Sequence, residues 1–78
     1  MSQKAVIAVL EEFMRWAMEE AVSLYAKDSI SEEERGELNA YFNILDWGNQ
    51  QAEIMDVQYG DKELQAFDPY SLMRKKAA

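Results

Sequence analysis

The stretch Asp28-Ser29-Ile30-Ser31-Glu32-Glu33-Glu34 decides the fold, because it separates two long segments that both favour helix. Ser31 followed three residues later by Glu34 is a capping box, and Ile30 precedes it as a hydrophobic staple residue. The three glutamates put negative charge at the positive end of a helix dipole, which explains the acidic run without a binding role. The sequence therefore predicts a turn here and a second helix from about residue 32.

The segment before this turn, residues 2–27, contains no Gly or Pro and is rich in Ala, Leu, Met and Glu. These are strong helix formers, so we expect one long helix. Its apolar face covers about half of the circumference, whereas one neighbouring helix needs only about 100°. We therefore expect two packing partners, or a partner outside the chain. The face consists of Val6, Leu10, Phe13, Met14, Ala17, Ala21, Leu24 and Tyr25.

The segment after the turn carries an apolar stripe at spacings of three and four residues. A continuous or kinked helix over about residues 32–58 keeps this stripe together, and the small residues Gly48 and Ala52 would then let another helix approach closely. The alternative is a helix end at Trp47-Gly48-Asn49, because Gly is common just past a helix end and Asn can cap the next helix. The stripe consists of Leu38, Tyr41, Leu45, Gly48, Ala52, Met55 and Tyr59.

The last third of the chain predicts shorter elements. Tyr59-Gly60-Asp61 is typical of a helix end and a turn, and Asp61 can cap a short turn through Phe67. Asp68-Pro69 places a capping carboxylate before a proline at the first helical position, which predicts a final helix of about eight residues. Its last turn would hold Arg74, Lys75 and Lys76, where cations complement the helix dipole.

These elements predict an all-α fold, an antiparallel two-helix hairpin with a short C-terminal helix. No alternating apolar pattern of a strand is present. The chain has 78 residues, of which 49% are hydrophobic, and we expect a single helical domain over residues 1–78. Dimerisation would complete such a hairpin as a four-helix bundle.

The composition removes most catalytic chemistry, because the chain contains no Cys and no His. Metal sites built on thiolate or imidazole are therefore excluded. The pairs Glu11-Glu12 and Glu19-Glu20 are similar to carboxylates of di-iron bundles, but those sites also need His. The acidic residues around Gly60 lack the ligand spacing of an EF-hand loop. With no phosphate-binding loop or nucleophile motif either, we expect no enzyme, no metal and no cofactor.

The net charge of −7 comes from 15 acidic and 8 basic residues. Three of the cations are Arg74, Lys75 and Lys76, so the rest of the chain is more acidic still. Such a body repels nucleic acids and anionic membranes and is attracted to basic protein surfaces. We expect no direct nucleic-acid binding and no membrane association. Mimicry of nucleic acid stays open, as does an acidic surface that serves only solubility.

The apolar run at residues 5–10 is ended by Glu11 and Glu12 and is too short for a secretory signal or a membrane span. The lack of cysteine agrees with a reducing compartment. We therefore expect a cytoplasmic protein.

The candidate partner-binding residues are large apolar side chains that a small fold can leave exposed, together with Gly48. Trp and Tyr are enriched at binding hot spots, and Met provides adaptable contact surface. The alternative is that the C-terminal helix folds back and buries them in the core. The candidates are Trp16, Trp47, Gly48, Phe67, Tyr70 and Met73.

In size, acidity and lack of cysteine the chain is similar to many small inhibitors and adaptors that phages and other mobile elements encode. We therefore expect a small acidic non-enzymatic protein-binding module that occupies a surface of a larger protein, with a basic surface as the favoured target. The competing hypothesis is a structural or regulatory homodimer, built on the apolar face of the first helix and the small-residue stripe of the second.

Overall fold

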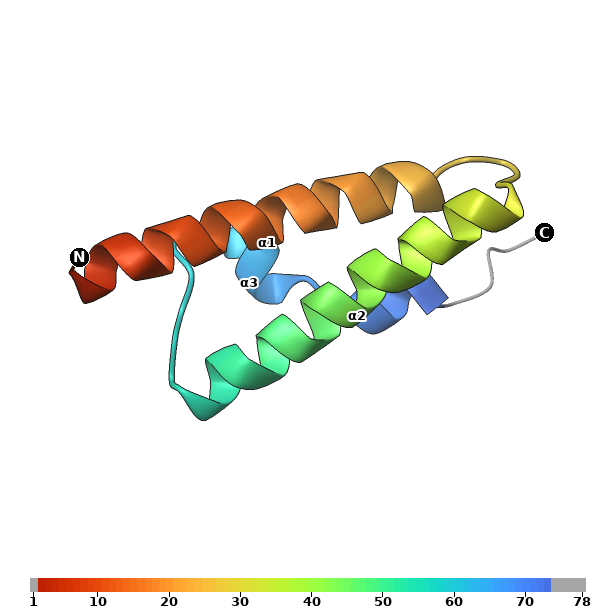
Figure 1. Ribbon diagram of the computed structural model, residues 1–78. Helices are drawn as coiled ribbons and strands as arrows, with labels where there is room; N and C mark the ends of the chain where they lie inside the picture. Colours follow the sequence, from red (N-terminus) through yellow and green to blue (C-terminus); the bar gives the residue numbers. More distant parts are fainter. Residues whose placement is uncertain (1, 74–78) are drawn as a thin grey trace.

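The computed structural model describes residues 2–73 and is all-α, which confirms the predicted helical hairpin. Helix α1 (Gln3–Tyr25) and helix α2 (Glu32–Ile54) are followed by the short helix α3 (Lys62–Ala66) and the 3₁₀ helix η1 (Pro69–Met73). Helices α1 and α2 run antiparallel and cross at an angle (Figure 1). They move apart toward the N-terminus of α1 and the C-terminus of α2, which we call the open end of the hairpin (Figure 1).

The turn between α1 and α2 forms as predicted. The Oγ atom of Ser31 accepts a hydrogen bond from the Glu34 backbone N–H at 3.1 Å, and Glu34 Oε1 accepts one from the Ser31 N–H at 3.1 Å. Lys27, just after α1, also donates a hydrogen bond to the Glu34 carboxylate. Ile30 packs against the hydrophobic core. The capping box is therefore confirmed, and Glu34 joins both sides of the turn.

Helix α2 is continuous through Gly48, which confirms the prediction that the helix does not end at Trp47-Gly48-Asn49. Gly48 does not adopt a positive φ, so it is not a helix end. A Cβ atom at this position would lie 2.6 Å from Cε and 2.7 Å from Sδ of Met14. The missing side chain therefore makes room for Met14 of α1, and the predicted close approach of another helix occurs within the chain.

The predicted end of this helix at Tyr59-Gly60 is wrong, because α2 ends at Ile54. Asp56 adopts a left-handed φ of 55° just beyond the helix. Its N–H donates to the Glu53 carbonyl at 3.2 Å, and the Val57 N–H donates to the Ala52 carbonyl at 2.8 Å. This is a Schellman motif, which satisfies the last carbonyls of the helix. Asp tolerates the left-handed conformation better than most residues, so no glycine is needed here.

The C-terminal elements follow the predicted capping residues but differ in form. Asp61 caps α3 by accepting a hydrogen bond from the Leu64 N–H at 3.1 Å. Asp68 Oδ1 accepts one from the Tyr70 N–H at 3.0 Å. The Ser71 N–H donates to the Asp68 carbonyl at 2.9 Å, the tighter bonding of a 3₁₀ turn, so the segment is a five-residue 3₁₀ helix and not an α-helix of about eight residues. The predicted last turn with Arg74, Lys75 and Lys76 lies outside the described residues.

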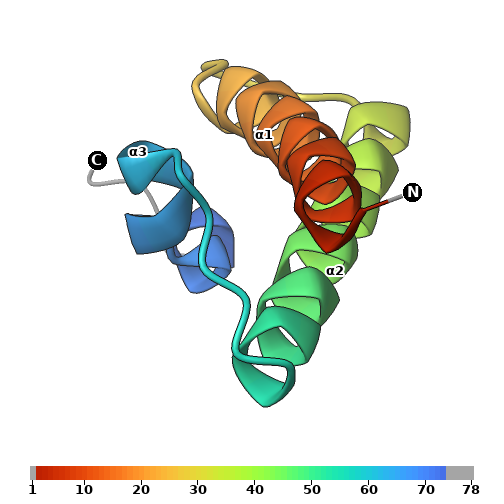
Figure 2. The ribbon, with the colours of Figure 1, turned by 90° about the vertical axis from the view of Figure 1, so that its left-hand side faces the viewer.

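Helix α3 is attached to α1 by a hydrogen bond between distant parts of the sequence. Glu11 Oε1 accepts from the Asp61 backbone N–H at 2.6 Å. Arg15, on the next turn of α1, lies 3.6 Å from the Asp61 carboxylate. In consequence α3 and η1 lie together on one side of the α1–α2 pair (Figure 2).

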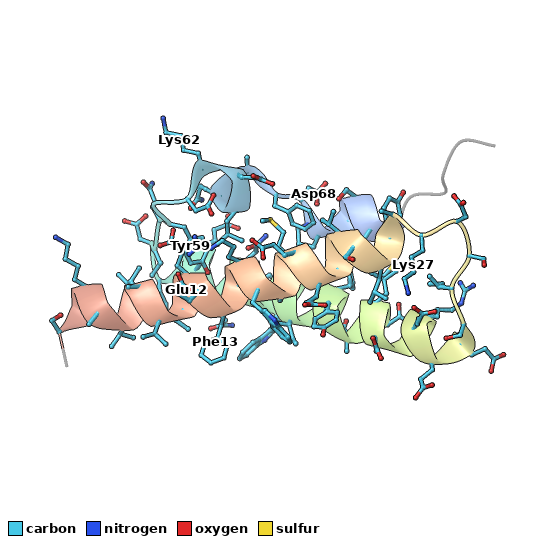
Figure 3. The ribbon with its side chains drawn as sticks, turned by 90° about the horizontal axis from the view of Figure 1, so that it is seen from above. Glu12, Phe13, Lys27, Tyr59, Lys62 and Asp68 are labelled. Carbon is cyan, nitrogen blue, oxygen red and sulfur yellow. The ribbon has the colours of Figure 1, made fainter. Side chains whose placement is uncertain are left out.

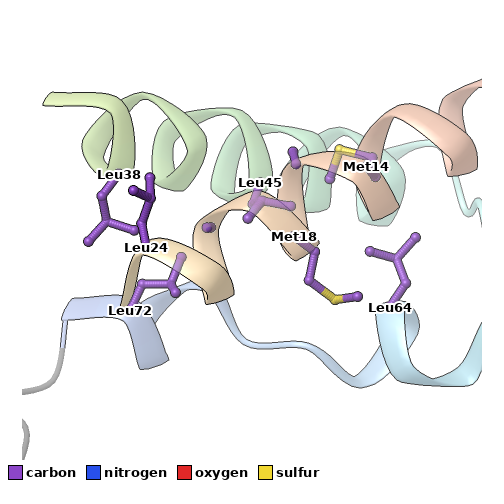
Figure 4. Close-up of a cluster of buried hydrophobic side chains, with 9 residues drawn as sticks. Met14, Met18, Leu24, Leu38, Leu45, Leu64 and Leu72 are labelled. Atoms are coloured by element: carbon purple, nitrogen blue, oxygen red, sulfur yellow. The ribbon is translucent and has the colours of Figure 1, made fainter. Parts of the chain in front are cut away.

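The core lies between α1, α2 and this C-terminal layer (Figure 4). Met18 of α1 points toward Leu64 of α3, and Leu24 lies with Leu38 and Leu72 (Figure 4). The latter three lie toward the turn that joins α1 and α2, which we call the closed end of the hairpin. Helix α1 thus has packing partners on two sides within the chain. The buried hydrophobic core cluster consists of Met14, Ala17, Met18, Ala21, Leu24, Leu38, Leu45, Leu64 and Leu72.

The prediction for the apolar face of α1 is wrong at three residues. Phe13 is 67% exposed, and Val6 and Leu10 are also exposed. Phe13 lies beside the strip that α2 covers, on the flank away from α3, where no element of residues 2–73 packs. Val6 and Leu10 belong to the N-terminal half of α1. Helix α2 moves away from this half of α1 (Figure 1). Met18, which the prediction left out, is buried because α3 covers it.

Candidate partner-binding face

The structure separates the six predicted partner-binding residues into two groups. The first group, Trp16, Trp47 and Gly48, lies on α1 and α2. Trp16 is 52% exposed and Trp47 is 66% exposed, whereas the Met14 side chain covers Gly48. The other three belong to the C-terminal layer. Phe67 is half-buried against the core, the Tyr70 ring packs edge-on against Phe42 at 5.2 Å, and Met73 is exposed.

The larger exposed group lies on the side of the hairpin opposite α3 and η1. Figure 3 shows Phe13 pointing from α1 to the side away from α3. Val9, Phe13 and Trp16 line one hollow on the surface of α1. On α2, Trp47 lies about 140° around the helix from Phe42, the residue that contacts η1. We call this side the uncovered face, and it consists of Val9, Phe13, Trp16, Ile44 and Trp47.

One aromatic contact joins the two helices beside this face. The Trp16 ring meets the Tyr41 ring edge-on, with centroids 5.5 Å apart and planes at 79°. Because edge-to-face contacts favour a defined ring orientation, Trp16 is held in place although half of it is exposed. An aromatic side chain that is already oriented loses less entropy when a partner covers it.

An apolar pocket of about 140 Å³ lies at the open end of the hairpin and shares Trp47 with the uncovered face. Met14 is its buried residue, and Leu10, Trp47 and Met55 form its exposed rim. We call it the terminal pocket. Its complete lining is Leu10, Met14, Trp47, Gly48, Gln51, Ala52, Met55, Val57 and Tyr59.

Carboxylates lie next to the uncovered face toward the closed end. Glu20 follows Phe13 by one heptad on α1, and Glu37 precedes Ile44 by one heptad on α2, so each lies on the same stripe as its apolar neighbour. Both are exposed. Glu12 borders the hollow formed by Val9, Phe13 and Trp16.

Four of the five basic residues in the described part of the chain lie elsewhere, and the fifth, Lys27, follows Glu20 by seven residues just beyond the end of α1. Arg15 forms ion pairs with Glu12 at 2.6 Å and with Asp61 on the α3 side. Lys27 is paired with Glu34 in the turn. Lys4 lies about 180° around α1 from Phe13. The remaining two are Lys62 in α3 and Arg35, which borders a hollow near Leu72. The uncovered face is thus apolar at one end and acidic at the other.

The chemistry of the other surfaces is limited. Within residues 2–73, no group of three or more acidic side chains is placed to hold a metal ion. A polar hollow of about 340 Å³ near the end of α2 includes Tyr59. Burial, and then the nearby Glu11 carboxylate, raise the pKa of Tyr59 above its usual 10.0. Its hydroxyl therefore stays protonated near neutral pH.

In comparisons with known proteins, no family model matches the chain, and no curated protein or solved structure is similar to it at a significant level. None of the helices in the described part of the chain combines the length and apolar composition needed to cross a membrane.

Sequence reasoning found the two tryptophans of the uncovered face but missed most of the residues around them. Phe13 belongs to the predicted apolar face of residues 2–27, and Val9 belongs to none of the predicted sets. A signal was present, because Val9, Phe13 and Trp16 recur at i, i+4 and i+7 as a second apolar stripe beside the core strip.

Proposed function

We propose that this protein is a small non-enzymatic binding module that acts by occupying a surface of a larger protein, as an inhibitor or adaptor. The observation that carries the proposal is the uncovered face, where Phe13, Trp16 and Trp47 are each more than half exposed. Large aromatic side chains dominate the energy of protein interfaces, so three of them in one exposed group favour partner binding. The absence of His and Cys from the sequence supports a role without catalysis.

The charge supports a basic target. With a net charge of −7, the protein would be drawn toward basic protein surfaces and repelled by nucleic acids and anionic membranes. We include a cytoplasmic location in the proposal, because a cysteine-free chain agrees with a reducing compartment.

The test is affinity capture from the native cells with matched variants. Phe13→Glu places a charge on the uncovered face, whereas Val22→Glu makes the same type of change at an exposed position about 180° around α1. We expect wild-type protein and Val22→Glu to retain the same larger protein and Phe13→Glu to lose it. Retention by all three variants, or equal loss with both glutamate variants, would contradict a role for this face.

A homodimer is the competing candidate, because the same exposed aromatic residues can be buried against a second copy. The homodimer hypothesis uses the small-residue stripe of α2 as an interface with the second copy. Met14 of the same chain already occupies the space above Gly48, so this stripe no longer supports the homodimer. Mass measurement in solution decides between the two: a monomer supports the binding module, and a dimer that Phe13→Glu dissociates supports the homodimer.

A further inference from the structure

We infer that the uncovered face receives an amphipathic helix of the partner, with one bulky apolar side chain in the terminal pocket and Lys or Arg residues beside Glu20 and Glu37. This inference rests on the proposed function and specifies the chemistry of the partner. Three features carry it: the size of the pocket, the geometry of two adjacent helices, and the distribution of charge.

The terminal pocket has the size of one side chain. Its volume of about 140 Å³ is close to that of an apolar protein cavity of about 150 Å³ that holds benzene. A Phe or Leu side chain therefore fits. Ala52 keeps the pocket open, since its side chain does not reach far into it, and Met14, which fills the space above Gly48, is an adaptable side chain.

The shape of the face favours a helical partner. Helical segments already pack on one side of α1 and α2, and no described element lies on the other side (Figure 2). Helices pack by fitting the side-chain ridges of one helix into the grooves of another. A helix laid in such a groove presents residues at i, i+3, i+4 and i+7, which is the helix-in-groove mode of recognition. Its apolar residues would cover Phe13, Trp16 and Trp47.

The charges give this helix a direction and distinguish it from a second copy. Glu20 and Glu37 lie toward the closed end, whereas Leu10, Trp47 and Met55 lie around the pocket at the open end. A partner helix with cations at one end complements this pattern, whereas a second copy adds another net charge of −7.

The test uses synthetic peptides, because the partner need not be known. The probe is an amphipathic Leu and Lys helix of about 18 residues, about 27 Å long, with one Phe near the end of its apolar side. One control peptide carries Ala in place of this Phe, and a second carries Glu in place of Lys. Binding is measured by fluorescence anisotropy. We expect the Ala peptide to bind about 10-fold more weakly, and the Glu peptide not to bind.

Two pairs of protein variants locate the binding site. Ala52→Leu fills the pocket, and Ala8→Leu makes the same change on the exposed far side of α1. We expect Ala52→Leu to weaken the affinity for the Phe peptide about 10-fold and Ala8→Leu to weaken it less than about 2-fold. The double change Glu20→Lys and Glu37→Lys should weaken binding more than Glu53→Lys with Glu63→Lys, which alters the net charge equally. Circular dichroism checks that each variant is folded.

Several outcomes would overturn the inference. Equal binding of the Phe and Ala peptides, or no effect of Ala52→Leu, removes the pocket as the anchor site. Equal binding of the Lys and Glu peptides removes the charge complementarity, and an absence of any peptide binding removes the helical partner. A dimer that Phe13→Glu dissociates makes a second copy the occupant. If the peptides fail but capture still depends on Phe13, the proposed function stands and only the nature of the occupant is wrong.

Discussion

Met18 and Phe13 lie five residues apart on α1, yet Met18 is 4% exposed and Phe13 67%. Both are large and apolar, and both flank the strip that faces α2. The difference is that α3 covers Met18, whereas no described element covers Phe13 (Figures 3 and 4). Burial in this protein is therefore decided by where the C-terminal layer docks, more than by the hydrophobicity of the residue.

The same contrast holds for the aromatic residues of α2. Phe42 packs against Tyr70 of η1 and lies against the core, while Trp47 remains 66% exposed. A hairpin covered on one side only can keep its fold on that side and leave the other for a partner. The predictions below test how far the stability of the two sides can be separated.

The largest expected effect on the free energy of unfolding comes from truncating a core residue, compared with truncating a residue of the uncovered face. Leu45→Ala should lower the free energy of unfolding by about 2 to 5 kcal/mol, because Leu45 is 1% exposed at the centre of the core. Phe13→Ala should lower it by less than about 0.5 kcal/mol, as is usual for surface substitutions. Urea unfolding measures both. Equal destabilisation by the two changes would show that Phe13 is buried and break the comparison.

Glu11→Ala tests the attachment of the covering layer. Loss of the carboxylate leaves the Asp61 N–H without its acceptor, and we expect a cost of about 1 to 3 kcal/mol for a hydrogen bond to a charged group. Glu12→Ala is the matched control, because its ion pair with Arg15 is exposed and such pairs contribute less than about 1 kcal/mol. Thermal unfolding followed by circular dichroism gives both values. The prediction fails if Glu12→Ala costs as much as Glu11→Ala.

Ser31→Ala tests the turn on which both sides depend. Removal of an N-cap hydroxyl costs about 1 kcal/mol, so the free energy of unfolding, measured in urea, should fall by this amount. Ser29→Ala, in the same turn but outside the capping box, should be close to neutral. An unchanged stability for Ser31→Ala would mean that the capping hydrogen bonds contribute nothing in solution.

Gly48→Ala should change the free energy of unfolding only slightly, because two contributions oppose each other. Better helix propensity contributes up to about 1 kcal/mol, and displacement of the Met14 side chain offsets it. The Met14→Ala background separates the terms, because there the new Cβ atom meets no side chain and the full gain should appear. The double-mutant cycle is measured by urea unfolding. Identical effects in the two backgrounds would exclude the contact between Gly48 and Met14.

The smallest effect concerns pH. Hydrogen bonds from Lys27, and then from the Ser31 N–H, hold the pKa of Glu34 below its usual 4.5. A carboxylate with a lowered pKa stabilises the fold above the usual pKa, and this contribution disappears as the pH falls through the pKa of the folded protein. The melting temperatures of wild type and Glu34→Gln should therefore differ at neutral pH and converge in acid. Glu33→Gln removes a charge from the same helical turn without removing either hydrogen bond of the Glu34 carboxylate, and it should lower the melting temperature at neutral pH less than Glu34→Gln does.

The parts of the fold that local signals determine could be predicted from the sequence. Ser31 and Glu34 recognise each other within one turn, and the apolar stripe through Gly48 requires a continuous helix. The end of α2 could not be predicted in this way, because Asp56 takes a conformation that is more common for Gly. Met18 and Phe13 could not be assigned either, since their burial depends on a layer contributed by distant residues.

The candidate site was predictable only in part for the same reason. Trp16 and Trp47 were selected by residue type, and the structure places both in the exposed group. The terminal pocket could not be inferred from the sequence, because it arises from the crossing angle of α1 and α2 together with the small residues Gly48 and Ala52. Its role as an anchor site stays a proposal.

The hydrogen bond between Glu11 and Asp61 also bears on the order in which the chain assembles. Helices α1 and α2 are joined by a short turn, whereas docking α3 closes a loop of 50 residues, and the entropy cost of closure grows with loop length. Moreover, η1 packs on both α1 and α2, so its docking surface exists only after the hairpin has formed. We therefore expect the C-terminal third to be the last part to fold and the first to open. The aromatic side of the hairpin would then be complete before the core on the other side is closed.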